Sequence, residues 1–297
     1  MNKQKLVEIA QRNIEMRRIQ AEDVARRAQE HLMENSTFAT LERQLRRVQV
    51  QYAMGDHSQQ TAQKLAQLKE QRKQLLAQLG IQEGQLAPHY HCSKCDDTGY
   101  VNGQVCSCLA DEVRKMLIKQ SNVANSAYTF ENSTETDKHN LGMYNLAKTA
   151  CQEGQNILLV GQTGTGKTYL ITACANLALA SGKSVLFTTA YNLANSFLQA
   201  HISELETRQA ILDSITEVDV LVIDDLGTEK SYKTVTGDYL FAVINERIAQ
   251  NKQTFISTNL SLQQIRDKYD ERLFSRLVDQ KITKVIKLVG ADKRVDK

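Results

Sequence analysis

A glycine-rich octapeptide in the middle of the chain has the composition of a phosphate-binding loop. It fits the pattern G-x-x-x-x-G-K-[ST] and consists of Gly161, Gln162, Thr163, Gly164, Thr165, Gly166, Lys167 and Thr168. Glycines let the backbone curl until its N–H groups point at phosphate oxygens, and the helix N-terminus that follows adds partial positive charge. An apolar run at 157–160 precedes the loop, as this chemistry requires. The pattern predicts that Lys167 contacts the β- and γ-phosphates of ATP and that Thr168 ligates Mg²⁺.

Two adjacent carboxylates follow a strand that is buried by composition. The apolar run 220–223 ends in Asp224 and Asp225. Carboxylates this close to a buried strand end repel each other unless a cation is present. We therefore expect Asp224 to hold Mg²⁺, directly or through water, and Asp225 to polarise the attacking water. A surface acidic turn is the alternative, and the phosphate loop argues against it.

A polar strand end and a pair of arginines complete the candidate catalytic set. Asn259 follows the apolar run 254–257 and could reach the γ-phosphate or its water. Arg272 and Arg276 lie four residues apart, on one face of a helix expected over about 261–279. Two guanidiniums so presented suit a γ-phosphate held by an adjacent subunit, because an arginine supplied in trans stabilises developing charge. A solvated helix with its charges balanced is the alternative.

Four cysteines form two close pairs around a short glycine-containing segment. The pairs are Cys92 with Cys95 and Cys106 with Cys108. Four thiolates at such spacing predict a tetrahedral Zn²⁺ site. The Cys-x-Cys spacing is tight, so His89 or His91 could replace one ligand, and reduced thiols without metal are the other alternative.

The elements that must position these residues divide the chain into three expected parts. Residues 1–80 hold few glycines and repeat apolar residues at helical spacing, which predicts an α-helical module of two or three antiparallel helices. Residues 81–120 form the cysteine-rich segment and a linker helix. Residues 121–297 alternate strands with helices, which predicts an α/β domain with a mostly parallel five-stranded sheet. The expected strands are 156–160, 184–187, 218–223, 254–257 and 282–288, and the expected helices are 167–180, 190–202, 236–250 and 261–279.

The charge is distributed unevenly along the chain. The chain has 37 basic and 34 acidic residues, yet residues 1–80 alone hold 14 basic and 9 acidic ones. The helical module is therefore a solvated hairpin, a docking arm for a partner protein or, third, a nucleic-acid contact. The charged N-terminus and the lack of an apolar run of about 18 residues favour a soluble cytoplasmic protein with no membrane contact.

From about residue 90 onward the chain resembles AAA+ ATPases of the DnaC/DnaI helicase-loader family. The residues that carry the resemblance are the runs 221–227, 257–259 and 271–276, which look like the family's Walker B, sensor I and box VII elements. The resemblance implies that Asn259 is the sensor I residue and that Arg276 is the first candidate for the arginine finger, with Arg272 beside it. It also offers Arg294 as a nucleotide contact after the last strand. Asp225 stands where many AAA+ proteins have Glu, which implies slow hydrolysis.

The resemblance further implies partners and cofactors. The segment 90–108 looks like the cysteine segment of Gram-positive and phage helicase loaders, whose N-terminal module contacts the replicative helicase. Expected ligands are ATP, Mg²⁺ and Zn²⁺, and expected partners are the hexameric replicative helicase, single-stranded DNA and further copies of the chain in a spiral or ring. Tyr191, Phe197 and His201 could contact the DNA, although Phe197 fits a core position equally well. The alternatives are an ATP-dependent transposase helper of the IstB type and an adaptor that binds nucleotide with little hydrolysis.

Overall fold

The computed structural model describes residues 3–123, 125–229 and 235–293. The chain divides into two compact units, of which one spans Ile9–Leu109 and the other consists of the chain from Ala110 onward together with the residues before Ile9. The division falls inside helix α4 (Ser107–Gln120). The finer separation expected at residues 80 and 120 stays a prediction.

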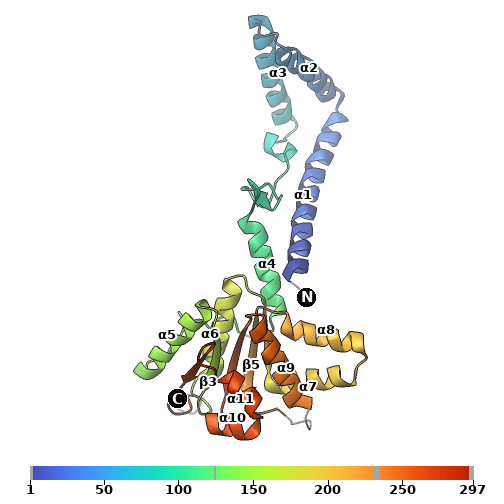
Figure 1. The fold of residues 1–297 in the computed structure, drawn as a ribbon. Helices are drawn as coiled ribbons and strands as arrows, with labels where there is room; N and C mark the ends of the chain where they lie inside the picture. The colour runs from blue at the N-terminus through green and yellow to red at the C-terminus, as the bar shows by residue number, and fades with distance from the viewer. Residues whose placement is uncertain (1–2, 124, 230–234, 294–297) are drawn as a thin grey trace. The chain divides into compact units, whose positions relative to one another are not determined.

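Helices dominate the first unit, as predicted (Figure 1). Asn35 and Ser58 cap two of them by accepting hydrogen bonds from backbone N–H groups of the first turn. Between these helices Gly55 has a φ of 107°, a conformation that only glycine adopts without strain. The elements are α1 (Lys3–Met33), α2 (Ser36–Ala53), α3 (Gln59–Gln78) and the 3₁₀-helix η1 (Glu83–Leu86).

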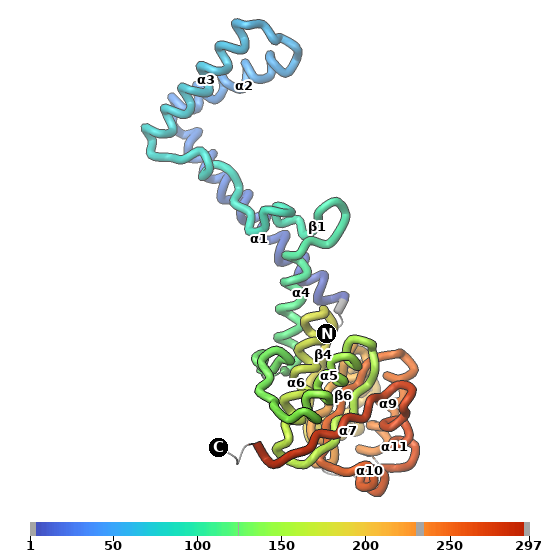
Figure 2. Tube along the Cα trace, turned by 90° about the vertical axis from the view of Figure 1, so that its left-hand side faces the viewer, coloured from blue at the N-terminus to red at the C-terminus, as the bar shows by residue number. Residues whose placement is uncertain are grey.

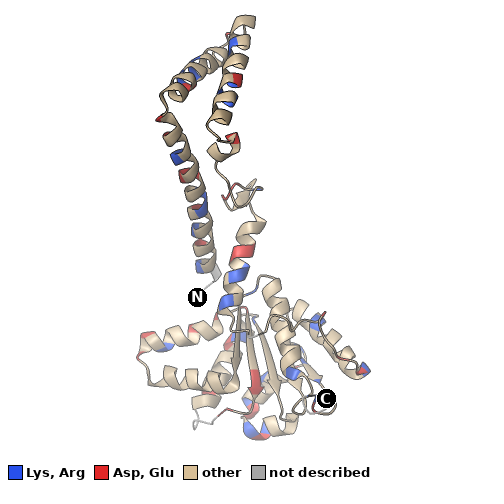
Figure 3. Cartoon of the chain, turned by 180° about the vertical axis from the view of Figure 1, so that it is seen from behind, with Lys and Arg blue, Asp and Glu red and all other residues tan. Residues whose placement is uncertain are grey.

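The packing inside this unit is thin. Two small apolar clusters hold α2 and α3 together with the end of α1 and with η1. They consist of Leu32, Phe38, Leu76 and Leu86, and of Leu45, Val48 and Leu68. Basic and acidic residues are interleaved along the outer faces of these helices (Figure 3). The first unit therefore has little apolar area to stabilise it.

A short hairpin forms within the cysteine segment. Strand β1 (Tyr100–Val101) pairs antiparallel with β2 (Gln104–Val105). The connecting Asn102 and Gly103 have φ values of 51° and 77°, and two positive values are what a tight primed turn needs. Beside this hairpin runs α1, where the Tyr100 hydroxyl donates to Gln11 at 3.4 Å (Figure 2).

The second unit contains a five-stranded parallel sheet in the order β4-β5-β6-β3-β7, which confirms the predicted fold class. Its central strands are buried on both faces, and Val220 to Ile223 of β5 are 0% exposed. The strands are β3 (Asn156–Val160), β4 (Val185–Thr189), β5 (Val220–Leu226), β6 (Gln253–Thr258) and β7 (Thr283–Lys287).

Helices cover both faces of this sheet (Figure 1). Helices α5 and α6 lie on one face, and α7, α8 and α9 lie on the other. The helices are α5 (Lys138–Gln152), α6 (Lys167–Ala180), α7 (Ala190–Ile202), α8 (Leu205–Thr216), α9 (Val235–Ala249), α10 (Leu262–Lys268) and α11 (Glu271–Leu277). Among the described residues, no helix is long and apolar enough to cross a membrane.

The single helix expected over 261–279 is wrong. The structure has two helices in this range. The first ends at Lys268, because Tyr269 has an extended backbone. Asp270 caps the second by accepting a hydrogen bond from the Leu273 N–H at 2.8 Å. Arg272 and Arg276 still share one helix, α11. Helix α8 was not predicted. Cys151 and Cys174 are buried in the second unit.

Candidate nucleotide site and cysteine cluster

The phosphate loop lies where the sequence placed it, between β3 and α6. Gly164 and Gly166 have φ values of 79° and 89°, so the loop requires glycine at both positions. The N-terminus of α6 follows directly, with Lys167 as its first residue. The loop therefore presents backbone N–H groups and a helix dipole at one point, which is an arrangement suited to phosphate.

A cavity of about 570 Å³ opens beside this loop. Its lining includes Gly164, Gly166, Lys167 and Thr168 from the loop, together with residues of other strands and helices. The Lys167 side chain is buried, and its ammonium donates to the Gln162 carbonyl at 2.7 Å. That bond holds the charge within the loop, close to where phosphate oxygens would lie.

The two predicted acids lie at the end of β5 with different roles. Asp224 is 5% exposed, and its carboxylate accepts a hydrogen bond from the Thr168 hydroxyl at 3.1 Å. Two ligands on adjacent positions of an octahedral Mg²⁺ lie about 3 Å apart, given metal–oxygen distances of about 2.1 Å. The pair therefore fits the predicted magnesium site. Asp225 lines the cavity instead, with a φ of 56°.

Ser257 joins the two acids, and the sequence analysis assigned it no role. Its hydroxyl donates to the Asp224 carboxylate and accepts from the Asp225 N–H at 2.9 Å. Ser257 is 0% exposed and lies on β6, next to an irregularity in the β5–β6 pairing between Ile223 and Leu226. This irregularity contains both acids, and such bulges commonly redirect side chains at active sites. A serine near a strand end gives no signal of this kind in the sequence.

The remaining predicted residues differ in their position relative to the cavity. Asn259 is exposed and lines the cavity, as a sensor residue should. Arg272 and Arg276 are exposed on α11 and do not line this cavity, and Arg272 pairs with Asp270 at 2.8 Å. Arg294 lies outside the described residues.

Three tyrosines form an aromatic wall that the sequence analysis missed. The Tyr128 and Tyr169 rings lie 4.6 Å apart between centroids, and Tyr144 stacks on Tyr169 at 6.4 Å. All three line the cavity. Burial raises the pKa of Tyr144 to about 12, so its phenol stays neutral at pH 7. The wall suits a flat aromatic base. Its members come from three separate segments, so only the fold reveals it.

A basic residue from the C-terminal segment also lines the cavity. Lys293 donates its backbone N–H to the Gly164 carbonyl at 3.1 Å and pairs through its side chain with the buried Glu135. Asp292 lies so close to Gly164 that a Cβ there would come within 1.9 Å of its carboxylate. The segment next to the predicted Arg294 therefore reaches the phosphate loop.

The four cysteines converge as predicted. Their sulfur atoms all lie within 4.8 Å of one another, with Cys92 and Cys106 at 3.8 Å and Cys95 and Cys108 at 3.4 Å. Four sulfurs bound to one zinc at about 2.3 Å lie about 3.8 Å apart, so the residues fit a tetrahedral Zn²⁺. Within the described part of the chain, neither histidine joins this group.

Backbone contacts prepare the cluster for a metal. The buried Asp97 accepts hydrogen bonds from the N–H groups of His91 and Cys92 at 2.7 and 2.9 Å. A hydrogen bond from the Cys108 backbone lowers the pKa of the Cys106 thiol to about 7. Thiolates are the form that binds zinc, so this shift favours ligation by Cys106, whereas burial raises the pKa of the Cys108 thiol above its usual value. His89 and His91 are exposed.

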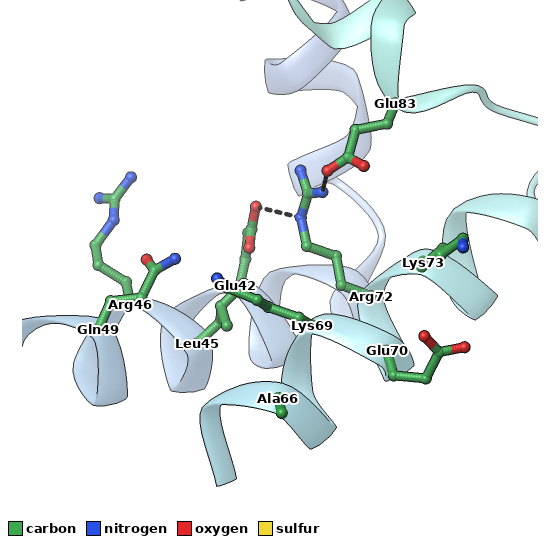
Figure 4. Close-up of a pocket in the computed structure, with 10 residues that line it drawn as sticks. All are labelled: Glu42, Leu45, Arg46, Gln49, Ala66, Lys69, Glu70, Arg72, Lys73 and Glu83. Atoms are coloured by element: carbon green, nitrogen blue, oxygen red, sulfur yellow. Dashed lines mark hydrogen bonds and ion pairs between the residues drawn. The ribbon is translucent and has the colours of Figure 1, made fainter. Parts of the chain in front are cut away.

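A groove of about 620 Å³ crosses the α2–α3 hairpin (Figure 4). Arg72 lies beside it and bridges Glu42 at 3.1 Å and Glu83 at 2.5 Å. Arg46, Lys69 and Lys73 line the same groove with their side chains exposed or half-buried. The predicted DNA contacts lie elsewhere: Tyr191 is 45% exposed and His201 is exposed, whereas Phe197 is a core residue at 1%.

A family model described as IstB-like ATP-binding protein matches residues 110–293. The match covers more than half of the chain, so the chain belongs to this family of AAA+ ATP-binding proteins. The matched residues include the phosphate loop, both acids, Asn259 and the α11 arginines. The predicted resemblance of the chain to DnaC/DnaI helicase loaders is confirmed.

Several individual proteins are similar to parts of the chain. The replicative helicase loader DnaC of Escherichia coli K12 is 27% identical over 124 residues, which is 41% of this chain and 49% of DnaC. The chain thus matches about half the length of that relative. The phage-like element PBSX protein XkdC of Bacillus subtilis is 26% identical over 253 residues, 76% of this chain and 92% of XkdC. The solved structure of AMPPCP-bound DnaA from Aquifex aeolicus superposes with a TM-score of 0.50 at 25% identity, covering 57% of this chain and 52% of DnaA.

Proposed function

We propose that the chain is an ATPase that loads the replicative DNA helicase onto single-stranded DNA. The proposal rests on one observation, which is that the candidate arginines lie apart from the other residues of the nucleotide site. Lys167, Thr168 and Asp225 line the cavity, and Asp224 is bonded to the Thr168 hydroxyl. Arg272 and Arg276 are exposed on α11, outside the cavity. In this scheme the α11 arginines act in the site of a neighbouring copy, so nucleotide binding favours assembly of several copies.

Each residue of the site has a distinct chemical role in this scheme. The Lys167 ammonium neutralises the β- and γ-phosphates, and Thr168 with Asp224 holds the cation. Mg²⁺ held there would supply positive charge that offsets the charge developing on the phosphates. Asp225 accepts a hydrogen bond from the attacking water, and Asn259 orients it. Arg276 of the neighbouring copy stabilises the charge of the transition state, with Arg272 beside it. The short carboxylate of Asp225 reaches less far than Glu, so hydrolysis is slow.

The first unit supplies the partner contact. The groove between α2 and α3 presents Arg46, Lys69 and Lys73, which suits an acidic surface of the helicase. Zinc bound by the four cysteines would stiffen the segment that joins this hairpin to the ATPase unit. In this scheme a spiral or ring of copies holds the helicase open on single-stranded DNA in the cytoplasm.

The experiment is a loading assay with the full chain and the purified replicative helicase of the same cell or phage. Closed circular single-stranded DNA has no end to thread, so stable helicase on the circle requires loading. We expect ATP-dependent loading that is lost when Arg46, Lys69 and Lys73 are all changed to Glu. A matched triple change of Arg12, Arg17 and Lys119 to Glu, which lie outside the groove, should leave loading intact. Failure of the parent chain to bind the helicase at all would contradict the proposal.

The family description favours a second candidate, an ATP-dependent transposase helper of the IstB type. Such a helper assembles on duplex DNA and binds a transposase, so parallel pull-downs with helicase and transposase separate the two. A third possibility is an adaptor that binds nucleotide with little hydrolysis. Steady-state ATPase measurements with single-stranded DNA and helicase present decide that point, because an adaptor would show no stimulation.

A further inference from the structure

A buried glutamate lies shortly after the strand that carries the two acids. The Glu229 side chain is 3% exposed. One of its oxygens accepts a hydrogen bond from the Gly227 N–H at 2.7 Å. The other accepts from the Tyr269 hydroxyl at 2.5 Å and faces the Lys268 ammonium at 3.3 Å. The carboxylate is thus satisfied on both oxygens by two separate parts of the chain.

The first part that Glu229 contacts is the end of the nucleotide-binding strand. Gly227 follows β5 with a φ of 105°, and a Cβ there would lie 2.6 Å from the Leu260 side chain. The preceding Leu226 carbonyl accepts from the Thr258 hydroxyl at 2.6 Å, next to Asn259. Gly227 is therefore packed tightly against both strands that end at the cavity.

The second part is the start of the helix that carries the arginines. Tyr269 and Lys268 form the break between α10 and α11, and Lys268 also donates to the Gly227 carbonyl. Asp270 comes next, caps α11 through the Leu273 N–H and pairs with Arg272. Hydrogen bonds therefore connect the end of β5 through Glu229 to Tyr269. The adjacent residue, Asp270, is bonded to the first turn of α11.

Only a carboxylate satisfies this position. Three donors converge on Glu229, and a neutral amide offers one acceptor oxygen in place of two. Burial raises the pKa of Tyr269 well above its usual value, so the phenol keeps its proton and donates a hydrogen bond to Glu229. Loss of one acceptor oxygen of Glu229 would leave a buried donor without a partner. Because this is costly, we expect the residues between α10 and α11 to move.

We propose that Glu229 is a positioning residue that fixes the α11 arginines relative to the nucleotide-binding strand of their own subunit. The inference rests on the proposed action of these arginines in a neighbour's site. Because the strand end and α11 are linked, the state of one subunit's nucleotide site is passed to the arginines it offers to the next. Glu229 itself does not line the nucleotide cavity.

Mixed assemblies of the full chain test this directly. Acceptor subunits carry Arg272→Ala and Arg276→Ala and keep an intact phosphate loop. Donor subunits carry Lys167→Ala and keep their arginines. ATP hydrolysis by the mixture then depends on donor arginines acting in acceptor sites. Glu229→Gln is placed in the donor or in the acceptor, and Glu246→Gln, exposed on α9, serves as the matched control.

We expect Glu229→Gln in the donor to lower the hydrolysis of the mixture by about tenfold, because a misplacement of about 1 Å costs up to about a hundredfold. The same change in the acceptor should leave the rate within about twofold, with the ATP Kd unchanged. Tyr269→Phe in the donor, which removes a single hydroxyl, should act in the same direction.

Two results would overturn the inference: equal loss from donor and acceptor, which marks a general stabilising contact, or no loss from either. Absence of hydrolysis in the unmodified donor–acceptor mixture would overturn the arginine in trans itself. That failure is visible before Glu229 is changed, so it is distinguishable from a failure of the Glu229 inference. Thermal unfolding of each variant checks that the ATPase unit remains folded.

Discussion

The nucleotide site and the cysteine cluster differ in what holds their functional atoms in place. Thr168, Asp224 and Ser257 are fixed by hydrogen bonds to one another, and Lys167 by one to the Gln162 carbonyl. The apolar residues of the strands beneath them are 0–9% exposed. The cysteines lie on a short segment whose strands have two residues each. The fold therefore prepares the first site for its ligand, whereas the second site needs its ligand to hold the local fold.

Zinc removal should have the largest effect. A structural zinc contributes about 10–16 kcal/mol in small domains, which exceeds what two-residue strands supply. Treating the reduced full chain with a chelator should abolish hydrogen-exchange protection in residues 90–109 and leave β3, β5 and β6 protected.

The metal content gives a direct check. Metal analysis should find one zinc per chain, and Cys151→Ala, a buried cysteine outside the cluster, should retain it. Reduced protein that contains no zinc yet keeps its protection would show that the segment folds without metal.

Loss of the phosphate-loop lysine comes next. We expect Lys167→Ala to weaken ATP binding about a hundredfold, equivalent to about 2.7 kcal/mol, because a charge-assisted contact to phosphate is lost. The loop should stay folded, since its shape depends on glycines. Binding of a fluorescent ATP analogue measures the change, with the exposed Lys281→Ala as the control. Unaltered affinity in Lys167→Ala would remove the assignment of the loop.

The same contrast explains how far the sequence could predict the structure. Lys167, Asp224 and Asn259 were found because each follows a strongly apolar strand, and parallel strands bring their ends to one edge. The cysteines were found by spacing alone. Tyr128, Tyr144 and Ser257 were missed, because their roles arise from packing between distant segments.

Local signals were also overlooked. Asp270 followed by Glu271 is a common helix start, and it marks the break inside the helix expected over 261–279. The Asn102–Gly103 pair is a strong hairpin signal within the cysteine segment. Helix α8 has no such start signal in the sequence. Its N-cap residue is Glu204, whose side chain makes no capping hydrogen bond.

Ser257→Ala should have a smaller effect, on rate rather than on binding. The hydroxyl positions Asp224 and Asp225 but does not lie against the phosphates, so we expect kcat for ATP hydrolysis to fall about tenfold, or about 1.4 kcal/mol. The ATP Kd should stay within about twofold. Ser196→Ala on α7 is the control, because that hydroxyl bonds only within its helix. A pure loss of ATP affinity in Ser257→Ala would mean that the serine serves the fold of the loop instead.

The smallest effect belongs to the helical hairpin, where neither metal nor buried network is involved. Arg72 contacts Glu42, Glu83 and, at 5.9 Å, the Phe38 ring, and its side chain remains 18% exposed. Such pairs are worth about 0.5–1 kcal/mol each and weaken with salt. Arg72→Met should therefore reduce the opening free energy of α2 and α3, measured by hydrogen exchange, by about 1–2 kcal/mol at low salt and by less at high salt. Arg46→Met in the same groove should change it little. A loss of several kcal/mol in this opening free energy, independent of salt, would mean that Arg72 alone stabilises the hairpin as strongly as zinc is expected to stabilise the cysteine segment. The proposed difference between the two regions would then be wrong.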